Sequence, residues 1–314
     1  MQFCKALRLG FVALSVSGLV VFAVPAGAQA PDAPTPLVTP AWLAERISDA
    51  DVRLVDLGKR LEEFEAGHLR RAQYVDWRND LVDPENRAHF GILRPEAFEA
   101  LMSRLGIDAD TTVVLYDSHS NRVAARTFWI LSYYGHADVR ILNGGSPAWE
   151  AAGGALTAEI LPVVSTDYRI ESQEQRYRAD KAFVQAAVGR EGFEIVDARA
   201  PQFYTGESGG SQFGSDVPNA KIGRMPGAQS FFWADHVNED GTYKSIEELR
   251  AHYEGLGIKP DETVITYCHI GLQASTPWFV LTQLLGFEDV RLYDGSMAEW
   301  ANATDTELVV DAND

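Results

Sequence analysis

The chain has 314 residues and a formal charge of −18 at neutral pH, with 45 acidic side chains against 27 basic ones. This excess of negative charge excludes nucleic acid as an expected partner, because the phosphates would be repelled. It also means that a small anionic substrate must be attracted by a local positive potential and not by the protein as a whole. The seven histidines lack metal-ligand spacing and no nucleotide-binding glycine motif follows a predicted strand, so the sequence predicts no metal and no cofactor.

The first thirty residues have the pattern of an export signal. Lys5 and Arg8 precede an apolar run over 9–24, and small residues end at Ala30. We therefore predict a cleavable signal peptide at 1–30, a periplasmic location and no stable membrane association after cleavage. An uncleaved anchor is the alternative, although the apolar run is short for a bilayer span. Cleavage would remove Cys4 with the signal, so that no intramolecular disulfide could form.

The remaining sequence contains one unit twice. Leu105-Gly106-Ile107 recurs 151 residues later as Leu256-Gly257-Ile258. Earlier in each copy the offset is 141, as for Leu54-Val55-Asp56 and Ile195-Val196-Asp197. The second copy therefore holds an insertion of about ten residues, for which the Gly/Ser-rich stretch Gly206–Gly223 is the obvious location.

Each copy has the size of a single domain. We predict a first domain at 37–157, a linker at 158–178 and a second domain at 179–304. In the first, apolar strand patterns alternate with helical patterns, and such alternation predicts an α/β fold with a mainly parallel sheet and helices on both faces. The strand patterns are at 53–56, 113–116 and 139–142, and the helical ones at 95–105 and 125–134.

The segment that carries chemistry follows a buried-strand pattern at Val264–Tyr267. Cys268 ends this strand, and Pro277 opens a helical run after a short loop. Ligands of open α/β sheets bind at the carboxyl ends of strands, where the next helix has free N–H groups. With a glycine at Gly271, the loop can turn several amides inward around the cysteine's own thiolate, which predicts a lowered thiol pKa. His269 either adds positive charge or only faces solvent.

The segment of strand, cysteine, loop and helix occurs in the second copy only. With two α/β copies of this size and this segment, the chain resembles the tandem rhodanese family over nearly its whole mature length. Val196-Asp197-Ala198-Arg199 and Gly223–Ala228 match further motifs of that family, and Gly67–Ala72 is a degenerate version of the second. Where the second domain has Cys268, the first has Asp117, which cannot accept sulfur. The resemblance thus implies an inactive first domain and a catalytic second one.

The resemblance implies a sulfurtransferase that moves a sulfane sulfur from thiosulfate, or a related small anion, to a thiophilic acceptor such as cyanide or a thiol through a Cys268 persulfide. The alternatives are a 3-mercaptopyruvate sulfurtransferase and a non-enzymatic persulfide carrier or accessory binding protein, for which a protein thiol is a possible acceptor. In related proteins, Arg and Lys follow the cysteine of thiosulfate users and Gly and Ser that of 3-mercaptopyruvate users. His269 and Ile270 match neither pattern, and Phe203 or a neighbour stands in place of a usual arginine.

The resemblance also implies roles for individual residues. Asp197 and Ser275 would support the loop, and the two arginines Arg199 and Arg224 are candidates either for structural pairing, which we favour, or for the approach of the anion. The loop itself is the predicted substrate-binding segment, with Cys268 catalytic: His269, Ile270, Gly271, Leu272, Gln273 and Ala274. A cysteine phosphatase would need an arginine where Ala274 stands, which makes that class a poor alternative.

Overall fold

The computed structural model describes residues 35–212 and 216–311, all within one unit of the chain that begins at Pro34. The predicted signal peptide at 1–30 lies outside the described residues. Within the described ranges, the structure contains no helix whose length and apolar character would let it cross a bilayer.

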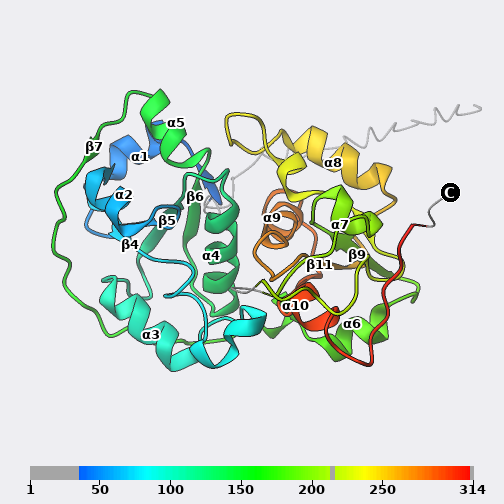
Figure 1. Cartoon of the computed structure of the whole chain (residues 1–314). Helices are drawn as coiled ribbons and strands as arrows, with labels where there is room; N and C mark the ends of the chain where they lie inside the picture. Colours follow the sequence, from blue (N-terminus) through cyan, green and yellow to red (C-terminus); the bar gives the residue numbers. More distant parts are fainter. Residues whose placement is uncertain (1–34, 213–215, 312–314) are drawn as a thin grey trace, which may run out of the picture. The chain divides into compact units, whose positions relative to one another are not determined.

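Each half of the chain forms a five-stranded sheet in which every pairing is parallel (Figure 1). The first sheet has the order β1-β6-β5-β2-β4 and the second the matching order β8-β12-β11-β9-β10. The first sheet consists of β1 (Leu37–Val38), β2 (Val52–Asp56), β4 (Gln73–Tyr74), β5 (Thr112–Tyr116) and β6 (Val139–Leu142). The second consists of β8 (Arg178–Ala179), β9 (Phe193–Asp197), β10 (Gln229–Ser230), β11 (Thr263–Tyr267) and β12 (Val290–Tyr293). A small antiparallel pair joins β3 (His68–Leu69) to β7 (Leu156–Thr157).

The helices connect these strands. In the first half they are α1 (Pro40–Arg46), α2 (Leu61–Ala66), η1 (Pro84–His89), α3 (Pro95–Arg104), α4 (Arg122–Tyr133) and α5 (Gly145–Ala151). In the second half they are η2 (Gln175–Tyr177), α6 (Lys181–Ala187), α7 (Pro201–Thr205), η3 (Trp233–His236), α8 (Ile246–Gly255), α9 (Ser275–Phe279) and α10 (Ser296–Trp300). The π-helical turn η4 (Val280–Leu284) follows α9 directly.

Helices cover both faces of each sheet, as the alternation of side chains along the strands requires. In β5, Val114 and Tyr116 join the core cluster under α1, α2 and α5. Val113 and Leu115, which point to the opposite face, join the cluster that includes α3 and α4. In β11, Ile265 and Tyr267 pack with α6 and α10, while Val264 packs with α8 and α9. The predicted fold class is therefore confirmed.

The two domains share a continuous apolar core. Helix α4 of the first domain packs against α9 of the second (Figure 1). Phe128 and Phe279 meet there edge to face, with ring centroids 4.9 Å apart. Because α9 begins just after the cysteine loop, this packing brings the start of α4 to the same end of the second sheet.

The predicted elements agree with the structure to within a few residues. Strand β6 has the predicted bounds, while β2 and β5 each begin one residue earlier. Helix α4 begins three residues earlier than the pattern at 125–134 predicted, because Arg122 and Val123 already have helical geometry. The helical run after Pro277 begins at Ser275 and changes to a π-helical turn at Val280. Residues 158–174 of the predicted linker form neither helix nor strand.

Candidate active site

Cys268 lies at the carboxyl end of β11 and is completely buried. Its backbone N–H donates to Ser296 Oγ at 3.1 Å, and its carbonyl accepts from the N–H of Met297 at 3.0 Å. Ser296 has a φ of 48°, a left-handed conformation that is unusual for a residue with a side chain. Helix α10 follows β12, the strand beside β11. The start of α10 thus holds the backbone of Cys268 in place.

The loop after Cys268 wraps its amides around the sulfur. The N–H groups of Ile270, Gln273 and Ala274 lie close enough to the sulfur atom to stabilise negative charge on it. Gly271 provides the turn with a φ of 78°, and Ser275 Oγ donates back to its carbonyl at 2.9 Å. This is the amide nest expected from the strand-loop-helix pattern, and it can stabilise negative charge on sulfur.

The expected lowering of the thiol pKa is wrong for the free protein. Burial raises the pKa of Cys268, because removal of water disfavours the thiolate. The three loop amides and the charge of Arg126 oppose this effect without overcoming it. The nest therefore offsets the cost of charging a buried sulfur instead of producing a permanently ionised thiol.

This pKa predicts how the reaction depends on pH. Below the pKa of a thiol, its thiolate fraction grows about tenfold for each pH unit. We expect the rate at which limiting thiosulfate adds sulfur to Cys268 to rise steadily between about pH 6 and pH 8, because the raised pKa lies above that range. The rate can be followed by intact mass. A plateau reached below about pH 7 would contradict this prediction and indicate a lowered thiol pKa.

His269 does not supply the positive charge that one sequence interpretation gave it. Burial and the nearby charge of Arg199 lower the pKa of His269 to about 4, so its ring is neutral at neutral pH. The ring is partly buried and meets Phe203 edge to face, with centroids 4.6 Å apart. A Cβ atom on Gly210 would lie 3.0 Å from His269 Nδ1, so the second domain's insertion passes close to this ring. His269 and Phe203 thus give the loop an apolar neighbourhood.

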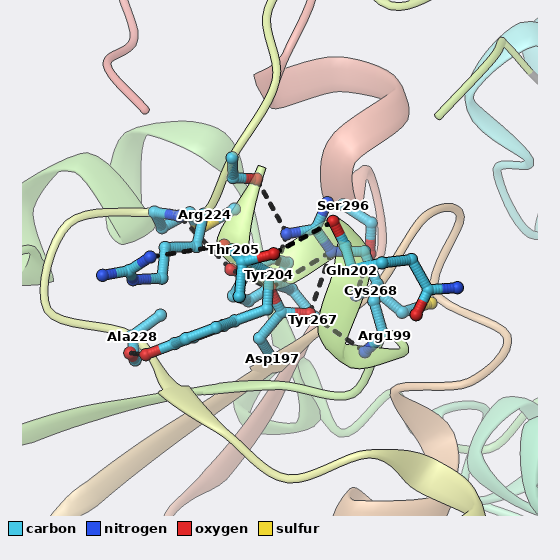
Figure 2. Close-up of polar contacts among 12 residues, drawn as sticks. Asp197, Arg199, Gln202, Tyr204, Thr205, Arg224, Ala228, Tyr267, Cys268 and Ser296 are labelled. Carbon is cyan, nitrogen blue, oxygen red and sulfur yellow. Dashed lines mark hydrogen bonds and ion pairs between the residues drawn. The ribbon is translucent and has the colours of Figure 1, made fainter. Parts of the chain in front are cut away.

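Asp197 ends β9 beside β11 and organises a buried cluster (Figure 2). Arg199 binds its carboxylate with two nitrogens, Nε at 2.9 Å and Nη2 at 2.6 Å, and Nη2 also donates to the carbonyl of Gly223 at 2.8 Å. Tyr267, the residue before Cys268, donates its hydroxyl to Asp197 at 2.6 Å and accepts the N–H of Met225 at 3.2 Å. Asp197 thus holds the end of the strand that presents the cysteine.

Neither of the two candidate arginines is available for the donor anion. Arg199 is buried, and Asp197 and Gly223 take up its hydrogen bonds. Arg224 forms an ion pair with Asp311 at 2.7 Å and lies over the ring of Tyr204, with Cys268 on the other side of the group in Figure 2. These contacts favour the structural pairing predicted for both arginines over a role in binding the anion.

The first domain has the same loop, but Asp117 fills it. The carboxylate of Asp117 is buried and accepts four backbone N–H bonds from the loop that follows it and from the first turn of α4. At Oδ1 these come from His119 at 2.7 Å and Asn121 at 3.0 Å, and at Oδ2 from Val123 at 2.8 Å and Ala124 at 3.0 Å. A fixed carboxylate thus occupies the amides that would otherwise receive an anion, which explains in physical terms why this copy cannot accept sulfur.

The model of the rhodanese-like domain matches this chain twice, at residues 39–152 and 180–303. The chain belongs to the rhodanese family. Both the predicted tandem arrangement and the predicted class of enzyme, a sulfurtransferase, are confirmed by this match together with the relatives that follow.

Two curated rhodanese relatives cover most of the chain. The sulfur carrier protein TtuD of Thermus thermophilus is 40% identical over 272 residues, which cover 86% of this chain and 94% of that protein. The thiosulfate sulfurtransferase of Corynebacterium glutamicum is 36% identical over 274 residues, which cover 86% and 88%. Among solved structures, the 3-mercaptopyruvate sulfotransferase SseA from Escherichia coli has a TM-score of 0.74 at 26% identity and covers 83% of this chain and 98% of its own.

Sequence reasoning missed Arg126, which reaches the cysteine loop from the first domain of this rhodanese. Its buried guanidinium donates to Asp294 Oδ1 at 2.6 Å, and Arg178 binds the other oxygen of the same carboxylate at 3.0 Å. A Cβ atom on Gly271 would lie only 2.9 Å from Arg126 Nη1, so a side chain at that position would collide with the arginine. The one available signal was the spacing of Arg122 and Arg126, which places both on one helix face.

Proposed function

We propose that this protein transfers a sulfane sulfur from thiosulfate, or a related donor, to a thiophilic acceptor through a persulfide on Cys268. The observation that carries this proposal is the cysteine sulfur held by three loop amides at the end of β11, in the domain where no carboxylate fills the nest. Cys268 is the one free cysteine among the described residues. The curated relative named thiosulfate sulfurtransferase supports the choice of donor.

The two half-reactions follow from this geometry. The Cys268 thiolate attacks the outer sulfur of thiosulfate, a new S–S bond forms, and the old one breaks with its electron pair leaving on sulfite. In the second step an acceptor such as cyanide attacks the outer sulfur of the persulfide, and the electron pair of the S–S bond returns to Cys268 as thiolate. The amides of Ile270, Gln273 and Ala274 stabilise the anionic sulfur in both resting forms.

The loop arrangement also positions the nucleophile without a general base. His269, the residue after Cys268, has a pKa of about 4. It is therefore neutral and a poor proton acceptor at neutral pH. The thiol proton therefore goes to solvent or to the incoming donor's solvent shell before attack. The structure shows no group of three or more potential metal ligands in its described part.

A carrier role is the second candidate, because the 40% identical relative is named a sulfur carrier protein. A carrier would hold the same Cys268 persulfide but pass its sulfur to a protein thiol. A third candidate, transfer from 3-mercaptopyruvate, is supported by the structural match to SseA. All three use Cys268 and differ in donor or acceptor.

Steady-state assays separate these functions. Thiocyanate formation from thiosulfate and cyanide supports the proposed activity, and faster release of pyruvate from 3-mercaptopyruvate supports the third candidate. Persulfide that forms from either donor but is discharged only by a protein thiol supports the carrier. An enzyme that forms no persulfide from either donor contradicts the proposed function.

We also propose that the protein is exported and acts in the periplasm after cleavage behind Ala30. The pattern of Lys5, Arg8 and the apolar run at 9–24 supports this location. Cell fractionation and the mass of the mature protein test it: a periplasmic protein that begins at Pro31 is expected. A full-length cytoplasmic protein would contradict the proposal.

A further inference from the structure

The second domain offers few cations to an anionic donor. His269 is neutral at neutral pH, and Ile270 is apolar. Arg199 and Arg224 are held by Asp197 and Asp311. An acidic protein with a formal charge of −18 nevertheless needs a local positive potential to bind thiosulfate. A cation from another element would add to the potential that the loop amides provide.

Helix α4 of the first domain provides such a cation in Arg122, its first residue. Among the residues that the structure describes, no carboxylate lies within ion-pair distance of its guanidinium, and its buried Nε has no hydrogen-bond partner. The side chain is only partly buried. The nearby carboxylate of Asp117 already accepts four backbone N–H bonds, two from its loop and two from the first turn of α4. Arg122 thus has donors to offer a ligand.

The position of Arg122 is fixed by contacts with the second domain. Its guanidinium lies over the ring of Trp233, 4.9 Å from the centroid. The backbone N–H of Trp233 donates at 3.1 Å to Ala198, whose own N–H donates at 2.9 Å to the carbonyl of Tyr267, the residue before the cysteine. The guanidinium is thereby held at the carboxyl edge of the second sheet, on the side of Cys268.

The charges around Arg122 agree with this placement. The Cys268 thiolate and Arg122 are near enough for their charges to interact, and so are Arg122 and Arg78. The buried Arg126, one helical turn further along α4, also acts on the thiolate. Asp117 also acts on Arg122, and Asp294 pairs with Arg126, yet both arginines of the first domain stabilise negative charge on the cysteine of the second.

We propose that Arg122 of the first domain is a substrate-binding residue that receives the anionic end of the sulfur donor at Cys268. This inference rests on the proposed function and gives the first domain a direct part in it. The first domain cannot carry sulfur, because Asp117 fills its nest, but it supplies the cation that the second domain lacks. The ligand class is a small sulfur-containing anion, with a dianion such as thiosulfate preferred to a monoanion.

The test compares Arg122→Gln with Arg122→Lys and with the matched control Arg104→Gln. The control removes the same charge from α3, where Arg104 faces Asp80 at 3.7 Å. The donors are thiosulfate and an alkylthiosulfonate monoanion, which deliver sulfur by the same step and differ in charge. For thiosulfate, we expect Arg122→Gln to lower kcat/KM on the order of ten- to a hundredfold, as loss of a charge-assisted contact does. Most of this loss in kcat/KM should come from a higher KM.

Three comparisons decide the outcome. The loss should be smaller for the monoanion, Arg122→Lys should recover part of it, and Arg104→Gln should stay within about twofold of the wild type. Equal losses with both donors, or an Arg122→Gln variant that matches the control, would overturn the assignment, because a structural role alone would not depend on donor charge.

A binding measurement keeps the test independent of turnover. Calorimetry with thiosulfate and the Cys268→Ser protein should show binding that Arg122→Gln weakens by a similar factor. Unchanged binding would contradict the role of Arg122 even if sulfur transfer were impaired. A wild-type protein that gains no sulfur from either donor would instead contradict the proposed function, and the calorimetric comparison would still decide the role of Arg122.

Discussion

Cys268→Ser is expected to abolish sulfur transfer, with a loss of at least about a thousandfold in turnover of thiosulfate. A serine hydroxyl in the same nest has too high a pKa to ionise and forms no persulfide. Because Cys268 is buried and its side chain serves no structural hydrogen bond beyond the loop amides, the variant should keep the wild-type fold. Thiocyanate formation measures the activity, and circular dichroism measures the fold.

The matched control is Asp117→Asn, which alters the corresponding position of the first domain. Asparagine keeps the shape of the side chain but replaces one acceptor oxygen with an amide group, so it perturbs the first-domain loop while Cys268 and its own loop stay unchanged in sequence. Activity should stay within a few-fold of the wild type. Activity that survives Cys268→Ser but is lost in Asp117→Asn would place the chemistry in the first domain and contradict the proposed role of Cys268.

Arg199→Met should cause the largest loss of stability, about 3 to 5 kcal/mol in the free energy of unfolding. The substitution keeps an apolar side chain of similar length but leaves the carboxylate of Asp197 buried without its ion pair. The hydroxyl of Tyr267 and the backbone N–H of residue 199 remain as neutral donors but cannot compensate that charge, so the strand end below Cys268 should also loosen. Urea denaturation measures the effect.

Arg224→Met is the control for this prediction, because its ion pair with Asp311 is half-exposed and should contribute no more than about 1 kcal/mol. Adding Asp197→Asn to Arg199→Met removes the stranded charge and should recover part of the lost stability. If Arg199→Met unfolded within about 1 kcal/mol of the wild type, the buried cluster would not have the structural role that its geometry indicates.

The sequence was sufficient to predict the repeated fold and the position of Cys268 between a strand and a helix. The 151-residue offset in the sequence corresponds to two sheets with matching strand order. The local patterns around Cys268 predict the buried strand before it and the helix after it. The amide nest is also local, because residues 270–274 form it by themselves. Features within one strand-loop-helix unit are the ones that sequence patterns describe well.

The electrostatics of the site could not be predicted in the same way. The direction of the Cys268 pKa depends on complete burial, and that burial comes from packing around the loop and not from the loop's own residues. The contact between Arg126 and Asp294 joins positions 168 residues apart in different domains. Likewise, the neutral state of His269 depends on burial and on Arg199, which no motif next to the cysteine indicates.

The proposed role of the first domain also depends on contacts between residues that are far apart in the sequence. Its substitution of Asp117 for cysteine indicated a supporting copy, and the four amides on that carboxylate explain the loss of sulfur chemistry. The contribution of α4 to the neighbouring site becomes visible only when Arg122 is found over Trp233 of the second domain. A degenerate domain can thus lose its own nucleophile and still shape the site of its partner.

The intact mass of the protein before and after thiosulfate, and again after cyanide, tests the persulfide on Cys268 most directly. We expect a gain of one sulfur atom, mapped to the peptide that contains Cys268, and its complete removal by cyanide with thiocyanate as product. A protein whose mass does not change with thiosulfate or 3-mercaptopyruvate, or one that carries the added sulfur on any other residue, would contradict a persulfide on Cys268.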